Sequence, residues 1–282
     1  MTRSFTKTEV LLDINKLNLA YGPKLILRDV DLRIHNIVRP NMNQGQVTAL
    51  LGPSGVGKTQ LFRCIAGLQA PTSGNVVLGD PMSAVGVDSQ MPKVAPRVKA
   101  GDVGVVFQNY PLLKHRTIWS NLKLAASRHG VNDEHIDKLL TRFNLMDKKK
   151  QYPHELSGGQ RQRIAIIQQM LCNTHFILMD EPFSGLDVKM KHEVCRFIQE
   201  VAEVDELNTT IFTTHDIETA CMIADTVWVM GHEKDDAGQN IPGARVVQTF
   251  DLIERGLAWN PQALSHPNFI PTVREIMALF MA

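Results

Sequence analysis

The chain of 282 residues lacks the sequence features that mark membrane-spanning and secreted proteins. Its apolar runs, such as those at 47–51 and 176–179, have the length of single strands and are too short to cross a bilayer. The first ten residues mix charged and polar side chains and lack the apolar stretch of a signal peptide. We therefore expect a chain that is soluble by itself.

Charge and cysteine usage argue against two further classes. Thirty Lys and Arg residues stand against 29 Asp and Glu residues, so the formal net charge is +1 and nothing supports a general nucleic-acid-binding surface. The four cysteines show no Cys-x-x-Cys spacing, so neither a zinc site nor a disulfide framework is indicated. Reduced thiols in a cytosolic protein are the simple interpretation. No nucleic-acid partner is expected.

Strand-sized and helix-sized patterns alternate along the chain, which predicts an α/β fold with a largely parallel sheet covered on both faces. The length fits one large domain, or one domain with an inserted lobe. Loops are expected at 37–44 and 80–100, which contain Pro and Gly. The expected strands are 10–19, 25–34, 47–51, 75–78, 103–107, 176–179, 210–212 and 226–230. The expected helices are 58–67, 118–127, 134–143, one that follows Ser157, 189–204 and 217–223.

The segment 52–59 reads Gly-Pro-Ser-Gly-Val-Gly-Lys-Thr and stands between an expected strand and an expected helix. Its glycines let backbone N–H groups wrap around a pyrophosphate, and the helix that follows adds its positive end. Lys58 would reach the β- and γ-phosphates of a bound nucleotide, and the Thr59 hydroxyl would bind Mg²⁺. The alternative is an ordinary glycine-rich turn, which does not explain the lysine and the hydroxyl in this context.

Two acidic residues follow the buried strand 176–179. Asp180 would hold Mg²⁺ directly or through water, because this cation prefers oxygen ligands. Glu181 would project to the other side of the strand end, where it would orient and polarise an attacking water. The alternative is two solvated acids in a turn, which Lys58 and Thr59 upstream make less attractive.

A second glycine motif, Ser157-Gly158-Gly159-Gln160, follows Leu156. Ser157 and the backbone of the two glycines open a helix, so the motif forms a second helix N-terminus that can bind an anion. The alternative is a helix N-cap with a glycine turn. That alternative explains Ser157 but not the whole motif in its place along the chain.

In this order the motifs resemble those of the ATP-binding cassette (ABC) family, specifically the detached ATPase subunits of ABC transporters. The resemblance extends over about 10–231. It implies the ABC ATPase fold: a P-loop NTPase core with a mostly parallel sheet, an antiparallel β subdomain and an inserted helical subdomain. It places the ATPase domain at 8–250, the helical subdomain at about 109–163 and a C-terminal tail at 251–282.

The resemblance gives each motif a role: 52–59 is the Walker A loop, 156–160 the signature motif, 176–181 the Walker B strand with the catalytic glutamate, and 184–187 the D-loop. The implied cofactors are ATP and Mg²⁺. The implied catalytic residues are Lys58, Gln108, Glu181 and His215, and the implied metal ligands are Thr59, Gln108 and Asp180. The implied ATP-binding residues are Tyr21, Gly52, Pro53, Ser54, Gly55, Val56, Gly57, Lys58, Thr59, Gln60, Ser157, Gly158, Gly159, Gln160 and Asp187.

Three single residues in this set have simpler alternatives. Tyr21 would stack on adenine, since an aromatic face binds a purine without a hydrogen-bond code, but it also suits a hairpin turn. Gln108 would touch the metal or the attacking water from a mobile loop, although a lone glutamine is usually a surface residue. His215 would donate to the γ-phosphate as charge develops there, although most histidines are structural.

The family places the signature motif of one subunit against the γ-phosphate of the ATP that its neighbour holds. We therefore expect a two-fold dimer with Asp187 at the interface, either a homodimer or a heterodimer with a relative. A membrane-spanning transporter subunit is the second expected partner. It would contact 109–116, where Tyr110, Leu112 and Leu113 are apolar, although packing within the lobe explains each of them equally well. The expected location is cytoplasmic, on the inner face of the cell membrane.

A single cassette looks more like bacterial importers, whose membrane parts are separate chains. Segments 180–187 and 214–218 look similar to the nitrate, sulfonate and taurine importers, and 108–116 looks as much like the polar amino-acid importers. A detached ATPase of an exporter, a lipid or lipoprotein system or a cell-division complex shares every motif. A soluble ABC ATPase of DNA repair or translation fits less well, because no zinc-binding cysteines or long coiled coils interrupt the cassette.

The chain departs from the family pattern at two places. At 167–169 the family usually has small residues and an arginine, and near Thr174 it commonly has a proline.

Overall fold

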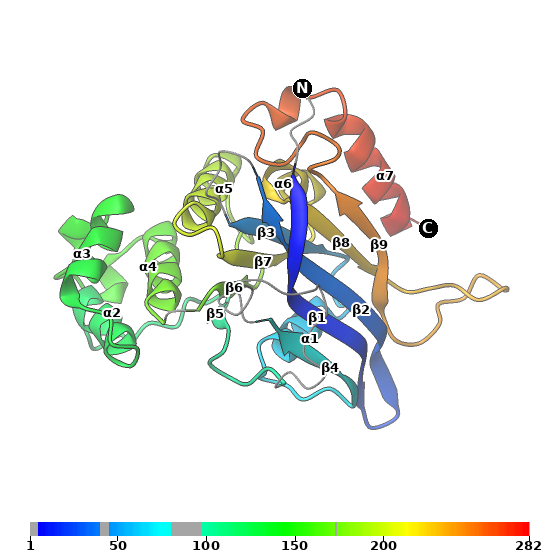
Figure 1. Cartoon of the computed structure of the whole chain (residues 1–282), viewed down its shortest axis with the longest axis horizontal. Coiled ribbons are helices and arrows are strands. Elements are labelled where there is room, and N and C mark those ends of the chain that lie inside the picture. Colours follow the sequence, from blue (N-terminus) through cyan, green and yellow to red (C-terminus); the bar gives the residue numbers. More distant parts are fainter. Residues whose placement is uncertain (1–4, 40–44, 80–96, 173, 282) are drawn as a thin grey trace.

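The computed structural model describes residues 5–39, 45–79, 97–172 and 174–281, and it contains two sheets with a group of helices to one side (Figure 1). The smaller sheet is antiparallel and has the order β2-β1-β4. Its strands are β1 (Thr6–Tyr21), β2 (Lys24–Val38) and β4 (Ser73–Leu78). The long β1–β2 hairpin turns directly after Tyr21, at a glycine with a positive φ of 57°.

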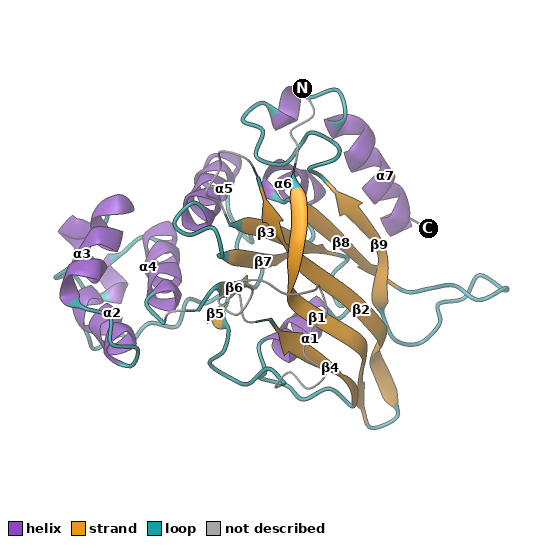
Figure 2. Ribbon diagram, viewed as in Figure 1, coloured by secondary structure: helices purple, strands orange, loops and turns teal. Residues whose placement is uncertain are grey.

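The larger sheet has six strands in the order β5-β6-β7-β3-β8-β9 (Figure 2). All neighbouring pairs are parallel except β8 and β9, which are antiparallel. Every residue of the three strands β3, β6 and β7 is buried, as expected for a parallel sheet covered on both faces. The strands are β3 (Gln46–Leu51), β5 (Gly104–Val106), β6 (Phe176–Met179), β7 (Thr209–Thr214), β8 (Thr226–Gly231) and β9 (Arg245–Asp251).

Seven α-helices are described. Three of them form a lobe at the side of the sheets, in which α2 packs against both α3 and α4 (Figure 1). The helices are α1 (Lys58–Ile65), α2 (Ile118–Ser127), α3 (Asp133–Arg142), α4 (Gly158–Met170), α5 (Val188–Ala202), α6 (Ile217–Ile223) and α7 (Phe269–Met281). Within the described part of the chain, no helix is long and apolar enough to cross a membrane.

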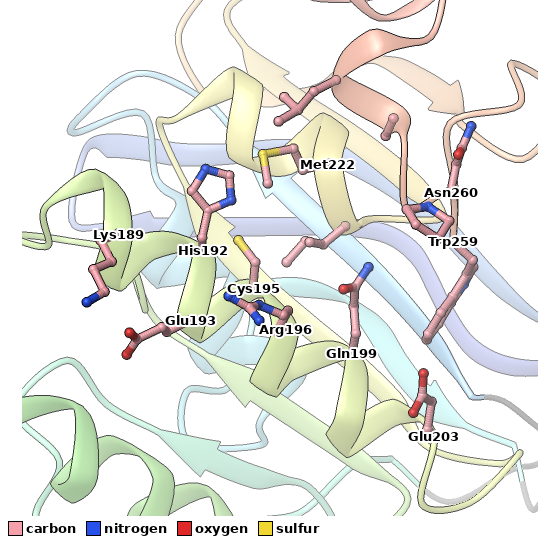
Figure 3. Close-up of a pocket in the computed structure, with 14 residues that line it drawn as sticks. Lys189, His192, Glu193, Cys195, Arg196, Gln199, Glu203, Met222, Trp259 and Asn260 are labelled. Atoms are coloured by element: carbon pink, nitrogen blue, oxygen red, sulfur yellow. The ribbon is translucent and has the colours of Figure 1, made fainter.

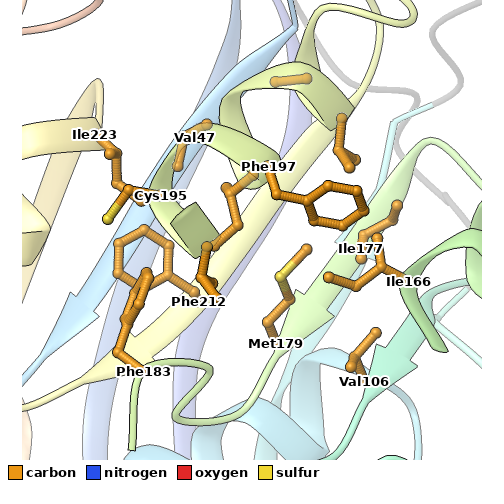
Figure 4. Close-up of a cluster of buried hydrophobic side chains, with 14 of the residues drawn as sticks. Val47, Val106, Ile166, Ile177, Met179, Phe183, Cys195, Phe197, Phe212 and Ile223 are labelled. Atoms are coloured by element: carbon orange, nitrogen blue, oxygen red, sulfur yellow. The ribbon is translucent and has the colours of Figure 1, made fainter. Parts of the chain in front are cut away.

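The buried side chains form two clusters. One lies between the two sheets and around α1, and it includes Leu27, Phe62 and Trp228. The other joins the opposite face of the large sheet to α5, α6 and the helical lobe, and Phe183 and Phe212 meet edge to face in it at 5.4 Å (Figure 4). The same cluster takes in Leu252, Trp259, Phe269 and Ile276, so the C-terminal segment packs into the main core.

The structure confirms the expected α/β architecture with a mostly parallel sheet and an antiparallel sheet, and helices 118–127 and 217–223 and strand 176–179 have the predicted bounds. The loop expected at 37–44 was wrong for Ile37 and Val38, which pair with Lys7 and Thr6 at the end of β2. Residues 40–44, and 80–96 of the other expected loop, lie outside the described part. Strand β9 and helix α7 had no counterpart among the expected elements.

Candidate functional site

The phosphate-type loop connects β3 to α1, as its sequence predicts. The backbone takes positive φ angles of 81° at Gly55 and 110° at Gly57, the residue that precedes Lys58 at the start of α1. A Cβ on Gly52 would lie 3.0 Å from the backbone oxygen of Met230, so the loop is closely packed where it leaves the strand. The side chains of Pro53 and Ser54 face solvent. The glycines therefore form the tight turn that a backbone cradle requires.

Lys58 is the cation at the centre of the loop, and only 7% of it is exposed. Its Nζ donates to the carbonyl oxygen of Gly52 at 2.7 Å and to that of Pro53 at 3.3 Å. The same atom lies 3.3 Å from Oε1 of Glu181. The structure thus brings together a lysine and a glutamate that are far apart in the sequence.

Glu181 also contacts His215, whose Nδ1 lies 3.1 Å from Glu181 Oε2. Strand β6 ends at Met179 and is followed by Asp180 and then Glu181, and His215 directly follows β7. The carboxyl ends of neighbouring parallel strands lie at one edge of the sheet, which explains why these side chains meet. The ring of His215 is largely exposed, so it can reach a bound group at this edge.

Asp180 lies beside Thr59 and Thr213. Thr59 Oγ1 is 3.5 Å and 3.4 Å from the two carboxylate oxygens of Asp180, and Thr213 Oγ1 donates to Asp180 Oδ1 at 2.7 Å. A hydroxyl and a carboxylate are the hard oxygen donors that Mg²⁺ prefers. The described residues contain no cluster of three His, Cys, Asp or Glu side chains for a metal. A magnesium ion bound here would therefore take its remaining ligands from phosphate oxygens and water, as in other phosphate-loop sites.

Tyr21 and Gln60 form a hydrogen bond with each other, whereas Gln108 does not contact the other predicted site residues through a hydrogen bond within the described part of the chain. The Tyr21 hydroxyl donates to Gln60 Oε1 in α1 at 2.8 Å, and 46% of the ring residue is exposed. The aromatic face is therefore held close to the phosphate-type loop. Gln108 lies in an exposed turn after β5 and makes no hydrogen bond to another residue of the described ranges.

The second glycine motif caps α4. Ser157 Oγ accepts from the backbone N–H of Gln160 at 3.2 Å, and Gln160 Oε1 accepts from the N–H of Ser157 at 3.0 Å. A Cβ added to Gly158 would meet nothing within 4 Å. Ser157 and Gly158 are exposed, and Ser157 has no hydrogen bond to the loop 52–60 within the described part of this single chain. The helix N-terminus is thus open to an outside group.

Asp187 has a comparable position at the next helix. Its side chain accepts from the backbone N–H of Met190 at 2.9 Å and so caps α5, while the residue itself stays exposed. The starts of α4 and α5 are close, because a Cβ on Gly159 would lie 3.7 Å from Met190 Cε. The signature and D-loop segments therefore share one region of the surface.

Two residues that contact this site were not among the predicted ones. Thr213, at the end of β7, accepts from the backbone N–H of Glu181 at 2.8 Å. Gln162 in α4 donates to the backbone oxygen of Pro182 at 3.0 Å. Both are polar residues at buried positions, 0% and 1% exposed. Thr213 lies one residue beyond the expected strand 210–212, and the observed β7 extends to Thr214, so the only signal was a threonine at the edge of a buried strand, where a buried hydroxyl needs a partner.

A separate hollow of about 730 Å³ lies between α5, α6 and the segment 259–264 (Figure 3). Lys189, Arg196 and Glu193 from α5 line it opposite Trp259 and Asn260. Charges of both signs occur in its wall, and none of the residues expected to bind ATP lines it. The hollow is therefore distinct from the site described above.

A strand, a glycine-rich loop that ends in Lys-Thr, a helix, and a second strand that ends in an acid define a P-loop nucleotide-binding protein. The family model described as ABC transporter matches residues 35–184, more than half of the chain. The chain belongs to the ABC transporter family, and it contains the family's ATP-binding domain.

Relatives agree with this assignment. The sulfate/thiosulfate import ATP-binding protein CysA of Pectobacterium atrosepticum is 35% identical over 78% of this chain and 63% of that protein. The glutamine transport ATP-binding protein GlnQ of Escherichia coli is 35% identical over 76% of this chain and 85% of that protein. The match covers between 54% and 63% of the length of four such sulfate/thiosulfate proteins.

Solved structures share the fold. The cbiO1 protein of Clostridium perfringens, described as part of the ABC transporter complex cbiONQ, has a TM-score of 0.68 at 22% identity. That comparison covers 96% of this chain and 99% of cbiO1. The expected family and fold are therefore confirmed.

Proposed function

We propose that this chain hydrolyses ATP with Mg²⁺ and that this reaction powers transport through a separate membrane-spanning partner. The observation that supports it most is the meeting of Lys58, Glu181 and His215 at one edge of the sheet, next to Asp180 and Thr59. This set holds a phosphate-binding cation, a carboxylate for water and oxygen ligands for a metal. Family membership makes ATP the nucleotide.

The loop and Lys58 bind the phosphates. Backbone N–H groups of 52–59 surround the β-phosphate, and the Lys58 ammonium exchanges its carbonyl partners for oxygens of the β- and γ-phosphates. Mg²⁺ held by Thr59 and Asp180, with Gln108 as a further ligand, would neutralise charge on these oxygens. The Tyr21 ring stacks on adenine while its hydroxyl stays bound to Gln60.

Glu181 and His215 act on the γ-phosphate end. Glu181 accepts a hydrogen bond from the attacking water and takes its proton as the new oxygen–phosphorus bond forms in line. The bond to the β-phosphate oxygen breaks, and its electron pair leaves with ADP. His215 donates a hydrogen bond to a γ-phosphate oxygen, where negative charge is concentrated.

A second copy completes the site. The open N-terminus of α4, with Ser157, Gly158, Gly159 and Gln160, binds the γ-phosphate of ATP held by the neighbour, and Asp187 lies at the same interface. ATP binding closes the dimer and hydrolysis reopens it, because ATP has higher affinity for the closed state. A homodimer is the simplest arrangement of a chain that carries both halves of the site. The complex would lie at the cytoplasmic face of the membrane.

The hydrolytic part is tested by Glu181→Gln, which keeps the shape of the side chain but removes the base. The purified chain should hydrolyse ATP in the presence of Mg²⁺, and the variant should lose about 100- to 10,000-fold in kcat while it still binds ATP. Wild-type turnover in Glu181→Gln would remove Glu181 from this role. The absence of any ATPase activity in the wild-type chain would refute the proposal.

The transport part is tested by purification of the tagged full chain from native membranes. A membrane-spanning subunit should accompany it. A solute-binding protein that stimulates ATP hydrolysis by this complex would support an importer, in agreement with the relatives. Hydrolysis that no solute-binding protein stimulates would favour the exporter, lipid, lipoprotein or cell-division alternative, and recovery without any membrane subunit would favour a soluble ABC ATPase.

A further inference from the structure

Thr213 is a polar residue at a fully buried position, and its hydroxyl lies between the two acids of the site. The residue is 0% exposed. Its Oγ1 lies 2.7 Å from Asp180 Oδ1 and 2.8 Å from the backbone nitrogen of Glu181. Because the N–H of Glu181 can only donate, the hydroxyl oxygen accepts there and its own proton is directed at Asp180. One side chain thus fixes both neighbours.

The backbone of Glu181 needs such a restraint. Its φ angle is +46°, in the left-handed region that residues other than glycine seldom occupy. Such a strained conformation persists only where neighbouring groups hold it. The hydrogen bond to Thr213 holds the nitrogen side of Glu181, and the N–H of Ser184 donates to its carbonyl oxygen at 3.1 Å. The next peptide is held by Gln162 through Pro182.

The carboxylate of Asp180 is oriented by the same hydroxyl. Thr213 donates to Oδ1, while Thr59 Oγ1 lies at nearly the same distance from both oxygens, 3.5 Å from Oδ1 and 3.4 Å from Oδ2. The short hydrogen bond from Thr213 is therefore the contact that fixes the rotation of the Asp180 carboxylate. Loss of that hydrogen bond would free the carboxylate to rotate.

We propose that Thr213 is a positioning residue of the ATPase site, which sets the geometry of Asp180 and Glu181 together. The inference rests on the proposed function, and Thr213, at 0% exposed, would act through the two acids without direct contact to the nucleotide. Its hydroxyl couples the carboxylate that would hold the metal to the carboxylate that would act on water. Both acids are therefore held by contacts within the protein itself, which is the preorganisation that catalysis needs.

The chain offers a matched control on the same strand. Thr210 is also 0% exposed, but its Oγ1 has no hydrogen-bond partner within the described ranges. Threonine to valine replaces the hydroxyl by a methyl group of similar size. The change at Thr210 removes no hydrogen bond, whereas the change at Thr213 removes two.

The experiment compares wild type, Thr213→Val, Thr213→Ser and Thr210→Val by kcat, by thermal unfolding and by the Kd for ATP in EDTA and in Mg²⁺. Thr213→Val should lower kcat by about tenfold to 100-fold, because small displacements of reacting groups have effects of this size. Its Kd for ATP in EDTA should stay within about twofold of wild type, since the loop and Lys58 are intact. The factor by which Mg²⁺ tightens ATP binding should fall. Thr213→Ser should restore most of both properties, and Thr210→Val should match wild type.

Thr213→Ala removes the hydroxyl without added bulk and replaces the valine variant if that one does not fold. Wild-type kcat together with a wild-type Mg²⁺ effect in either variant would overturn the inference and leave the proposed function standing. An equal loss in Thr210→Val, or a loss that Thr213→Ser does not restore, would also overturn it. A wild-type chain without ATPase activity would refute the proposed function itself, and this inference with it.

Discussion

The carboxyl and amino ends of the parallel strands in the large sheet hold their polar residues in opposite ways. At the carboxyl ends of β3, β6 and β7, Lys58, Glu181 and His215 form contacts that include loop carbonyls and partly exposed atoms, which a ligand can replace. At the amino ends of β3 and β8, Asp225 is 1% exposed and is surrounded by protein donors. The residues at the carboxyl ends can exchange these contacts for contacts with a ligand. The contacts of Asp225 at the amino ends are buried within the protein, so we call this the closed end. The residues proposed for catalysis thus lie at one end of the strands, and the residues that stabilise the fold lie at the other.

The closed end joins three distant segments. Asp225 forms an ion pair with Arg39 directly after β2, accepts from the backbone N–H of Val47 at 2.8 Å, and accepts from Trp259 Nε1 at 2.5 Å. The guanidinium of Arg39 also lies 5.3 Å from the centre of the Trp259 ring. Burial raises the pKa of Asp225 to about 6, against the attraction of Arg39 and the N–H donors. Asp225 therefore fastens the C-terminal segment to the sheet.

The largest effect on stability is expected for Asp225→Ala. The change leaves Arg39 as a buried charge without its counterion and should lower the free energy of unfolding by about 3–5 kcal/mol. Chemical denaturation measures this loss. The matched control is Asp13→Ala, because Asp13 pairs with Arg33, whose side chain is 60% exposed, and the loss there should be below about 1 kcal/mol. Equal losses in both variants would contradict the contrast between a closed and an open pair.

Lys58→Ala should have the opposite effects, a large loss of ATPase activity and a small change in stability. The change removes the cation that faces the phosphates and should lower kcat/KM for ATP by about 100- to 1,000-fold. Only 7% of Lys58 is exposed, so the change also removes the cost of burying a cation, which offsets the lost contacts to the carbonyls of Gly52 and Pro53. The free energy of unfolding should therefore change by less than about 1 kcal/mol. Steady-state kinetics and denaturation of the same sample test both halves of this prediction. A large loss of stability with normal kinetics would contradict the assignment of Lys58 to ATP binding and would make it a residue that stabilises the fold.

The motifs at the carboxyl ends could be read from the sequence because each is contiguous. Residues 52–59 and 180–181 carry chemically informative positions in a row, as 157–160 does at the start of α4, and a parallel sheet then brings the strand ends together. The closed end could not be found in this way. Arg39 and Trp259 are single residues, 186 and 34 positions from Asp225, and each type is common in surface or core positions by itself. Strand β9 and helix α7 were not predicted for a similar reason, because neither segment carries a recognisable motif.

The pH dependence of stability follows from the raised pKa of Asp225. The folded-state pKa of about 6 lies above the ordinary value of 3.8, so the folded state holds the extra proton between these values. Between pH 4 and 6, the free energy of unfolding of wild type relative to Asp225→Asn should fall as pH rises, by up to roughly 3 kcal/mol. Denaturation at pH 4, 5, 6 and 7 measures it. A constant difference across this range would contradict the closed environment of Asp225.

The smallest expected effect is that of Trp259→Phe. The change keeps an aromatic ring over Arg39 but removes the donor to Asp225, and it should lower the free energy of unfolding by about 1.5 kcal/mol. Trp228→Phe is a control of the same chemistry, since Trp228 is buried in the other cluster and its indole makes no hydrogen bond to a described residue. Turnover should be unchanged in both variants. A larger change in turnover than in stability would show that the two ends are not independent.

The central claim is that the nucleotide lies between two copies, with Lys58 from one and Ser157 from the other. Sedimentation of Glu181→Gln with and without ATP and Mg²⁺ tests it most directly, with the double variant Glu181→Gln, Ser157→Arg as the comparison. ATP should convert the 31.5 kDa chain to a particle of twice that mass, and Ser157→Arg should abolish this conversion while ATP still binds. A monomer with ATP bound to Glu181→Gln, or a dimer that is indifferent to Ser157→Arg, would contradict it.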